Sequence, residues 1–179
     1  MAGSRYNTGK PMMHLISPVL LDRHTLEGMV GGTEDGPHVV DAILATVRFL
    51  NSQSSVVGWL GELTAAENHL LRGDDPVKLL YSVGEVLTMG AKKYAPRNWE
   101  QGLSYVDTVD CIIRHGLKYL HAVETGDETL KLDEESGLPH VAHMLCNIMF
   151  LLHFEQESGK GIDDRRERMG LDDNTLNEG

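Results

Sequence analysis

The stretch Glu135-Ser136-Gly137-Leu138-Pro139-His140-Val141-Ala142-His143 decides the fold, because it opens an apolar run that ends near His153. Its two histidines are three residues apart, so they fall on one face of a helix. Ser136 and Pro139 are typical of a helix start. The pattern predicts a strongly apolar helix over residues 138–157, either central in the fold or buried in a subunit interface.

Histidines and carboxylates gather around this stretch. Five of the nine histidines lie between His115 and His153, and carboxylates such as Asp133 are interleaved with them. Arg114 and His115 fall together on another predicted helix. Histidine and carboxylate side chains are common ligands of divalent metals. The cluster therefore predicts a metal or phosphate site on a helical scaffold.

Composition sets the class of protein. The chain has 179 residues, 41% of them hydrophobic, which is enough for one well-buried core and predicts one domain. A formal net charge of −11 argues against a nucleic-acid polymer or an anionic membrane surface as the main partner. Two cysteines, both within apolar helical patterns, favour a reduced, cytoplasmic setting. No apolar run approaches the roughly 18 residues that a membrane span needs, so no membrane partner is expected.

Hydrophobic residues recur at helical spacing along almost the whole chain, and alternating strand patterns are few. The predicted fold class is therefore all-α. The predicted helices cover residues 15–29, 37–50, 56–71, 77–93, 105–123 and 138–157. We expect residues 1–158 to form the single domain and residues 159–179, charged and free of aromatics, to form a mobile acidic tail. Since one small helical layer cannot cover so apolar a last helix on every side, we also expect a homo-oligomer.

Several short motifs follow one another along the second half of the chain. They are Gly90-Ala91-Lys92-Lys93-Tyr94, Asn98-Trp99, Arg114-His115, Asp133, the stretch 135–143 and Asn147. In this order they resemble the phage dATP/dGTP diphosphohydrolase family, which is related to the all-α MazG-like nucleotide pyrophosphohydrolases. The resemblance covers a core of residues 76–158, and residues 24–74 look like an inserted helical segment.

The resemblance implies a MazG-like helical bundle of about five to six helices that converts a purine (deoxy)nucleoside triphosphate, such as dGTP or dATP, to the monophosphate and pyrophosphate. It also implies a divalent metal, Mg²⁺ or Mn²⁺, and the host cytoplasm for a phage-encoded protein. The chain departs from the MazG-like pattern in one respect. The usual Glu-x-x-Glu and Glu-x-x-Asp pairs are absent, and His140-x-x-His143 stands where the second pair would be. Imidazole suits manganese, iron or zinc better than magnesium.

Candidate site residues come from these motifs and from nearby carboxylates. The predicted metal ligands are Glu85, Asp110, Asp133, Glu135, His140 and His143. The predicted catalytic residues are Asp110, His115 and Glu135. The predicted substrate-binding residues are Lys93, Tyr94, Asn98, Trp99, Arg114 and Asn147. Glu85 is included because it interrupts an apolar surface, where an unpaired carboxylate is costly.

Each candidate also has an ordinary structural explanation. A histidine of the pair can hydrogen-bond a buried carboxylate or face solvent, and Asp133 and Glu135 can be helix N-terminal charges. Asp110 can pair with Arg114 within its helix, and Trp99 can cover the core instead of stacking on a base. The remaining histidines have no such constellation and are expected to be structural or exposed: His14, His24, His38, His69, His121 and His153.

Three functions stay open. The first is the pyrophosphohydrolase. The second is a deoxynucleotide triphosphohydrolase of the His-Asp metal type, although that class carries an adjacent His-Asp pair and this chain has none. The third is a non-catalytic purine-nucleotide-binding module that has lost the carboxylate quartet.

Overall fold

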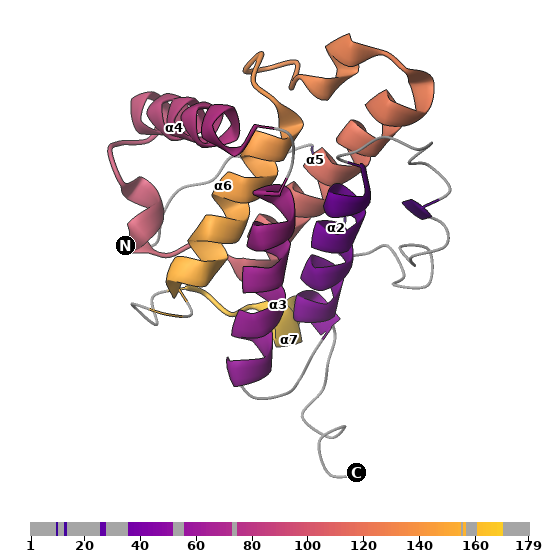
Figure 1. The fold of residues 1–179 in the computed structure, drawn as a ribbon. Helices are drawn as coiled ribbons and strands as arrows, with labels where there is room; N and C mark the ends of the chain where they lie inside the picture. The colour runs from indigo at the N-terminus through magenta and orange to yellow at the C-terminus, as the bar shows by residue number, and fades with distance from the viewer. Residues whose placement is uncertain are drawn as a thin grey trace.

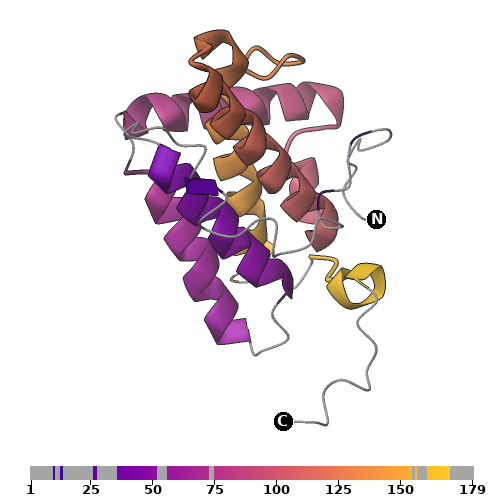
Figure 2. The same ribbon diagram turned by 90° about the vertical axis from the view of Figure 1, so that its right-hand side faces the viewer.

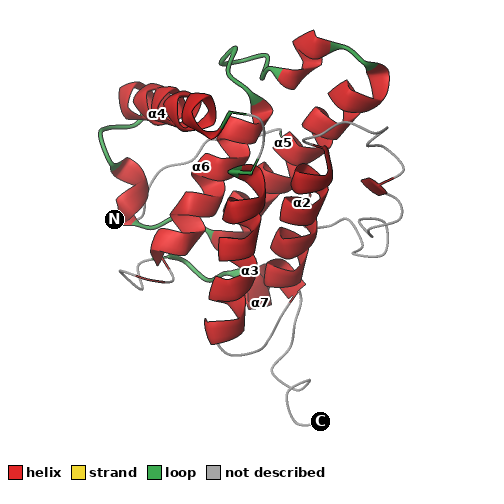
Figure 3. Ribbon diagram, in the orientation of Figure 1, coloured by secondary structure: helices red, strands yellow, loops and turns green. Residues whose placement is uncertain are grey.

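A computed structural model of the chain describes residues 36–51, 56–72, 75–154 and 161–169, together with residues 10, 13, 26, 27 and 156. Its helices are α2 (Gly36–Asn51), α3 (Val56–Leu70), α4 (Pro76–Lys93), α5 (Tyr105–Thr125), α6 (His140–His153) and α7 (Arg165–Met169), with short turns η3 (Asn98–Gln101) and η4 (Glu128–Lys131) (Figure 1). The described residues contain no β-strand, which confirms the all-α class (Figure 3). Within them, no helix combines the length and apolar character that crossing a membrane requires.

Helices α2, α3, α5 and α6 form a four-helix bundle. In it, α2 contacts α3 and α5, and α6 contacts the same two helices from the opposite side. Helix α4 lies outside the bundle, where it runs across α6 (Figure 1 and Figure 2). The apolar helix α6 is therefore central, as expected, and is covered by α3, α4 and α5 within the chain itself.

The bundle core is apolar and closely packed. Its fully buried members include Ile43, Phe49, Leu63, Ile112, Ile113, Leu120, Met144, Ile148, Leu151 and Phe154. Gly116 lets α2 and α5 approach each other, because a Cβ at this position would lie 2.7 Å from Ile43 Cδ1. Both α2 and α3 come from residues 24–74, the predicted insertion, so this segment supplies half of the bundle.

Local signals set the helix boundaries. Asp75 Oδ1 accepts a hydrogen bond from the main-chain N–H of Lys78 at 2.9 Å at the start of α4. Ser104 Oγ accepts one from the N–H of Asp107 at 3.0 Å at the start of α5. Gly126 ends α5 with a φ of 68°, a left-handed conformation that favours glycine. The structure confirms the predicted helices over residues 37–50, 56–71, 77–93 and 105–123, with ends that differ by one or two residues.

The last bundle helix is shorter than predicted. α6 begins at His140, where a start at residue 138 was expected, and its regular part ends at His153. Pro139 is extended, with φ −57° and ψ 135°, so the residues before it stay in the connector between α5 and α6. Ser136, which was expected to mark the helix start, lies in this connector, where its Oγ accepts a hydrogen bond from the N–H of Leu138 at 3.1 Å. His140 is therefore the first residue of the helix.

Residues 161–169 differ from the mobile tail that we expected from residue 159. The N–H of Tyr105 donates to the carbonyl oxygen of Ile162, and the N–H of Ile162 donates to the carbonyl oxygen of Leu103, both at 3.0 Å. Gly161 packs so tightly on Tyr105 that a Cβ there would lie 2.1 Å from the ring. Residues 170–179 and nearly all of the predicted helix 15–29 lie outside the described residues.

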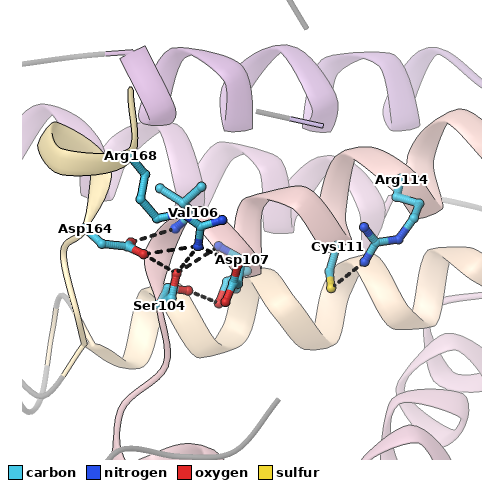
Figure 4. Close-up of polar contacts among 8 residues, drawn as sticks. Ser104, Val106, Asp107, Cys111, Arg114, Asp164 and Arg168 are labelled. Atoms are coloured by element: carbon cyan, nitrogen blue, oxygen red, sulfur yellow. Dashed lines mark hydrogen bonds and ion pairs between the residues drawn. The ribbon is translucent and has the colours of Figure 1, made fainter. Parts of the chain in front are cut away.

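Four side chains hold this C-terminal segment to the start of α5, and we call them the C-terminal clasp: Ser104, Asp107, Asp164 and Arg168 (Figure 4). Asp164 accepts hydrogen bonds from Ser104 Oγ at 2.5 Å and from the N–H of Val106 at 3.1 Å. Arg168 Nη1 donates to Asp107 Oδ1 at 2.6 Å and lies 3.4 Å from Asp164 Oδ2. Hydrogen bonds and ion pairs thus fix this segment. Such contacts produce no apolar periodicity, so the sequence pattern did not predict an ordered segment here.

Candidate functional site

A cavity of about 920 Å³ lies between α4 and the pair α5 and α6. One wall is the C-terminal half of α4 with the loop that follows it, residues 86–100. The other wall is one face of α6, formed by His143, Cys146, Asn147, Phe150 and His153. Helix α5 adds Cys111 and His115, one turn apart, and the connector adds Asp133, Glu135 and Ser136. This volume is in the usual range for small-molecule sites, roughly 300–1,000 Å³.

Asp133 organises the connector at the rim of the cavity. Its Oδ1 accepts hydrogen bonds from the N–H of Glu135 at 3.2 Å and of Ser136 at 3.0 Å. Its own N–H donates to the carbonyl oxygen of Leu138 at 2.8 Å, and Gly137, with a φ of 70°, permits the tight turn between them. The turn therefore holds the Asp133 carboxylate against the start of α6.

Three imidazole rings meet beside Asp133. The Nδ1 atoms of His115 and His140 are 2.9 Å apart. The ring of His143 stacks on that of His115, with centroids 4.5 Å apart and planes within 9°, and its Nε2 lies 2.9 Å from Ser136 Oγ. Ligand atoms of His115, Asp133 and His140 all lie within 4.8 Å of one another. We call these three residues the His–Asp triad, and they can hold a metal ion.

Burial controls the charge of the three rings. Burial, and then the neighbouring His143 and His140, lower the pKa of His115 to about 2. Burial lowers the pKa of His140 to about 4, although Asp133 opposes this, and it lowers the pKa of His143 as well. Burial favours a raised pKa for Asp133, but His115 and the N–H of Ser136 keep that pKa below its ordinary value. Near pH 7 the cluster therefore combines neutral imidazoles, the form that binds metals, with a carboxylate.

Lysines stand at the rim and are paired with Glu135. Lys93 Nζ donates to Glu135 Oε1 at 2.9 Å, and Lys10 Nζ lies 3.6 Å from Glu135 Oε2. The hydrogen bond to Glu135 raises the pKa of Lys93, and the same contact lowers the pKa of Glu135. Because these groups are largely exposed, the pairs are weak and can exchange for a phosphate or a cation.

Trp99, in the turn η3, belongs both to the cavity wall and to the edge of the core. Its ring stacks on Phe150, with centroids 4.8 Å apart, and meets His153 edge-on at 4.9 Å. It is half-buried and packs on the hydrophobic core. The structure therefore shows the covering role, while stacking of a base on Trp99 stays a prediction.

The cavity brings together most of the predicted site residues: Lys93, Tyr94, Asn98, Trp99, His115, Asp133, Glu135, His143 and Asn147. His140 is 2% exposed, lies outside the lining and reaches the site through its contact with His115.

Three further predicted residues lie outside the cavity lining. Glu85 is exposed on α4, so the expectation that it interrupts a buried apolar surface is wrong. Helical periodicity does not say which face a neighbour covers, and α4 packs mainly on α6. Asp110 is buried within α5. Arg114 donates from Nη2 to Cys111 Sγ at 3.0 Å on the same helix (Figure 4).

Among the lining residues that the sequence interpretation missed are four on α5 and α6: Cys111, Cys146, Phe150 and His153. His153 was expected to be structural or exposed, and the cysteines to be simple core residues. Three of the four share one face of α6 with His143 and Asn147, a spacing that is visible in the sequence. What the sequence does not reveal is that α4 leaves this face open to a cavity.

Comparison with known proteins adds a family. The model of the family described as "dATP/dGTP diphosphohydrolase, N-terminal" matches residues 63–165, more than half of the chain. The chain belongs to this family. Every lining residue of the cavity except Lys10 lies in the part that matches the diphosphohydrolase family. The match begins within α3, and so it reaches into the predicted insertion.

A protein of Salmonella phage PMBT28 named dATP/dGTP diphosphohydrolase is 33% identical to this chain over 84 residues. The aligned part is 47% of this chain and 26% of the phage protein, so the chain spans about a quarter of that relative's length. No solved structure gives a significant match to this member of the diphosphohydrolase family.

Proposed function

We propose that this chain hydrolyses a purine deoxynucleoside triphosphate, dGTP or dATP, to the monophosphate and pyrophosphate. The observation that carries the proposal is the His–Asp triad, of which His115 and Asp133 line a cavity of ligand size, inside the segment that matches the diphosphohydrolase family. The name of the phage relative supports the same substrate class.

The cavity offers a complementary group for each part of such a substrate. Lys93 and Lys10 stand at the rim, where they attract phosphate in a chain whose net charge is −11. Trp99, supported by Phe150, presents an aromatic surface for a purine base. Asn98 and Asn147 bring amide groups that can hydrogen-bond the base or the sugar.

The proposal includes a divalent metal at the His–Asp triad. Two imidazole nitrogens and one carboxylate fit Mn²⁺ better than Mg²⁺, which prefers oxygen ligands and bound water. Of the two ions predicted from the sequence, Mn²⁺ is therefore the one that suits these three side chains. When bound, such an ion supplies positive charge against the triphosphate and Lewis acidity at a phosphoryl oxygen.

The side chains at the rim carry the remaining chemistry. A water oxygen forms a bond to the α-phosphorus, the bond from that phosphorus to the α,β-bridging oxygen breaks, and pyrophosphate leaves. The Glu135 carboxylate accepts the proton of the attacking water, which is general base catalysis. Lys93, 2.9 Å from Glu135 without substrate, balances the charge of the leaving pyrophosphate. The stacked rings of His115 and His143 exclude bulk water from this side of the cavity.

Product analysis tests the proposal. The purified chain of 179 residues is incubated with dGTP, dATP or GTP in the presence of Mg²⁺ or Mn²⁺, and the products are separated by anion-exchange chromatography. Monophosphate and pyrophosphate in equal amounts support the proposal. Nucleoside and inorganic triphosphate would identify a triphosphohydrolase instead. Unchanged nucleotide that still binds in calorimetry would identify a non-catalytic binding module.

We also propose that the chain forms a homo-oligomer, as the sequence suggests, but through a different surface. The reason given from sequence was the apolar helix α6, which other helices of the same chain cover. Large apolar side chains remain exposed on α4, where Val77, Leu80 and Tyr81 are 64%, 54% and 76% exposed. Analytical ultracentrifugation of the wild type and of a Leu80→Ser, Tyr81→Ser double variant tests this, with loss of the larger species as the expected outcome.

A further inference from the structure

We propose that His115, Asp133 and His140 form a transition-metal site that takes Zn²⁺, Fe²⁺ or Mn²⁺ and discriminates against Mg²⁺. This deepens the proposed function, on which the catalytic role of the ion rests, whereas binding of the ion does not depend on it. The proposal stands on the convergence of three ligand atoms from separate parts of the fold: α5, the connector and the first residue of α6.

The distances suit a shared ion. The Nδ1 atoms of His115 and His140 point at each other across 2.9 Å. Two nitrogens bound to one zinc at about 2.0–2.1 Å lie roughly 3.3 Å apart in tetrahedral geometry, so the rings have to separate by only a few tenths of an ångström. Asp133 offers a carboxylate oxygen within 4.8 Å of a ring nitrogen of each histidine, which completes a set of two histidines and one carboxylate.

A hydrogen bond between the two imidazoles would explain the short distance between the Nδ1 atoms of His115 and His140. It does not explain why the Asp133 carboxylate lies beside them. The Asp133 carboxylate is fixed next to the rings by two main-chain N–H groups on its Oδ1. His143, stacked on His115 at 4.5 Å, fixes the plane of that ring. A carboxylate held beside the half-buried His115 and the buried His140 leaves a local negative charge in a partly dry site, and a bound cation neutralises it.

The donor set selects the class of ion. Imidazole nitrogen is a good ligand for zinc, iron and manganese, and two histidines with one carboxylate is a recurrent set for Fe²⁺. Mg²⁺ keeps several waters and is held mostly by carboxylates and phosphates. The three side chains therefore favour the transition ions.

The triad lies partly at the cavity surface. His115 and Asp133 line the cavity, while His140 lies outside the lining and is 2% exposed. Three protein ligands leave at least one coordination position free, as in catalytic metal sites, whereas structural zinc sites use four protein ligands. Because His115 and Asp133 line the cavity, an ion held by them would be within reach of a triphosphate bound there.

The test measures metal binding by the whole 179-residue chain. The protein is stripped with a chelator and titrated with Zn²⁺, Mn²⁺ or Mg²⁺ by calorimetry, and with Co²⁺ by visible absorption. We expect one equivalent of each transition ion and, since Mg²⁺ disfavours imidazole, an affinity for Mg²⁺ at least about 100-fold weaker. The variants His140→Gln and Asp133→Asn should each lose at least about 10-fold in affinity for Zn²⁺.

His121→Gln is the matched control, because His121 is exposed on the same helix as His115 and should bind metal like the wild type. Circular dichroism checks that each variant folds. If His140→Gln does not fold, the Co²⁺ spectrum of the wild type still reports whether nitrogen ligands are present. Mg²⁺ binding as tight as Zn²⁺ binding, or Zn²⁺ binding untouched by all triad variants, overturns the proposal. Mg²⁺-supported dGTP hydrolysis that survives in His140→Gln would keep the proposed function and reject this site.

Discussion

Helix α5 carries two polar clusters that differ in how their charges are arranged. At its start, the C-terminal clasp pairs one cation with two carboxylates: Arg168 contacts Asp107 at 2.6 Å and Asp164 at 3.4 Å. Two to three turns later, His115 meets two further imidazoles and Asp133. The clasp is complementary in charge, whereas the rings of the second cluster would repel one another if they were protonated.

The difference separates a structural role from a binding role. A cluster of opposite charges stabilises the fold as it stands, and needs nothing else. A cluster of buried imidazoles gains little for folding, because burial opposes their protonation and lowers the pKa of His115 to about 2 and of His140 to about 4. Histidines whose pKa is strongly lowered by burial are typical of functional sites.

The largest expected effect follows from removing charge from the His–Asp triad. Asp133→Asn should lower kcat for dGTP hydrolysis by at least about 100-fold, because the site loses the negative charge that holds a divalent ion. Steady-state pyrophosphate release measures this, and thermal unfolding should show that the fold persists. Activity close to that of the wild type would place the chemistry elsewhere in the cavity.

The next largest effect is expected in acid, where the histidine cluster should lower the free energy of unfolding. The buried histidines have folded-state pKa values below the ordinary value near 6.5, so the unfolded chain binds more protons than the folded one as pH falls through 6.5. The free energy of unfolding should therefore fall from pH 6.5 toward pH 4, by up to about 1.4 kcal/mol per pH unit for each ring.

Urea titrations at several pH values measure this slope. His115→Gln should flatten it, since glutamine does not titrate, whereas His121→Gln, at an exposed site, should leave it unchanged. A slope that His115→Gln does not alter would show that the buried rings have ordinary pKa values.

Removing the cation of the clasp should affect stability and spare activity. Arg168→Met leaves Asp107 and Asp164 facing each other at the start of α5 without their arginine, which should lower the free energy of unfolding by about 1–2 kcal/mol. Chemical denaturation measures the loss, with Arg72→Met, an exposed arginine, as control. Turnover of dGTP should stay within about two-fold, since the clasp lies outside the cavity lining. A large loss of turnover with unchanged stability would reverse the roles assigned to the two clusters.

The smallest effect is expected at the rim. Lys93→Met removes the main cause of the lowered pKa of Glu135, so that pKa should rise toward its ordinary value, and carboxyl-carbon NMR can follow it. In hydrolysis the same variant should raise KM a few-fold, as expected for an exposed phosphate contact. Lys78→Met, an exposed lysine on the same helix but outside the cavity lining, is the control. An unchanged titration of Glu135 would mean that the pair does not persist in solution.

The helices were readable from the sequence because their signals are local. Asp75 before Pro76, Ser104 and Gly126 each set a helix end through atoms within four residues. The C-terminal clasp was missed since its partners are about 60 residues apart and leave no periodic pattern.

The site was readable only in part. The spacing of His140 and His143 placed both near the cavity, and Asp133 with them. The sequence placed the stretch 135–143 opposite Arg114 and His115, but it could not tell that the Nδ1 atoms of His115 and His140 meet at 2.9 Å, because that depends on how α5 and α6 are rotated against each other. For the same reason it could not tell that Glu85 faces solvent.

The contact between Gly116 and Ile43 indicates which fragments of this chain can fold on their own. Gly116 follows His115 directly, and Ile43 belongs to α2, upstream of the segment that matches the family model. A fragment trimmed to residues 63–165 would keep nearly every cavity-lining residue and lose the helix against which α5 rests. The boundary of the family match is therefore no boundary for autonomous folding, and a recombinant fragment cut there is expected to expose apolar surface and aggregate.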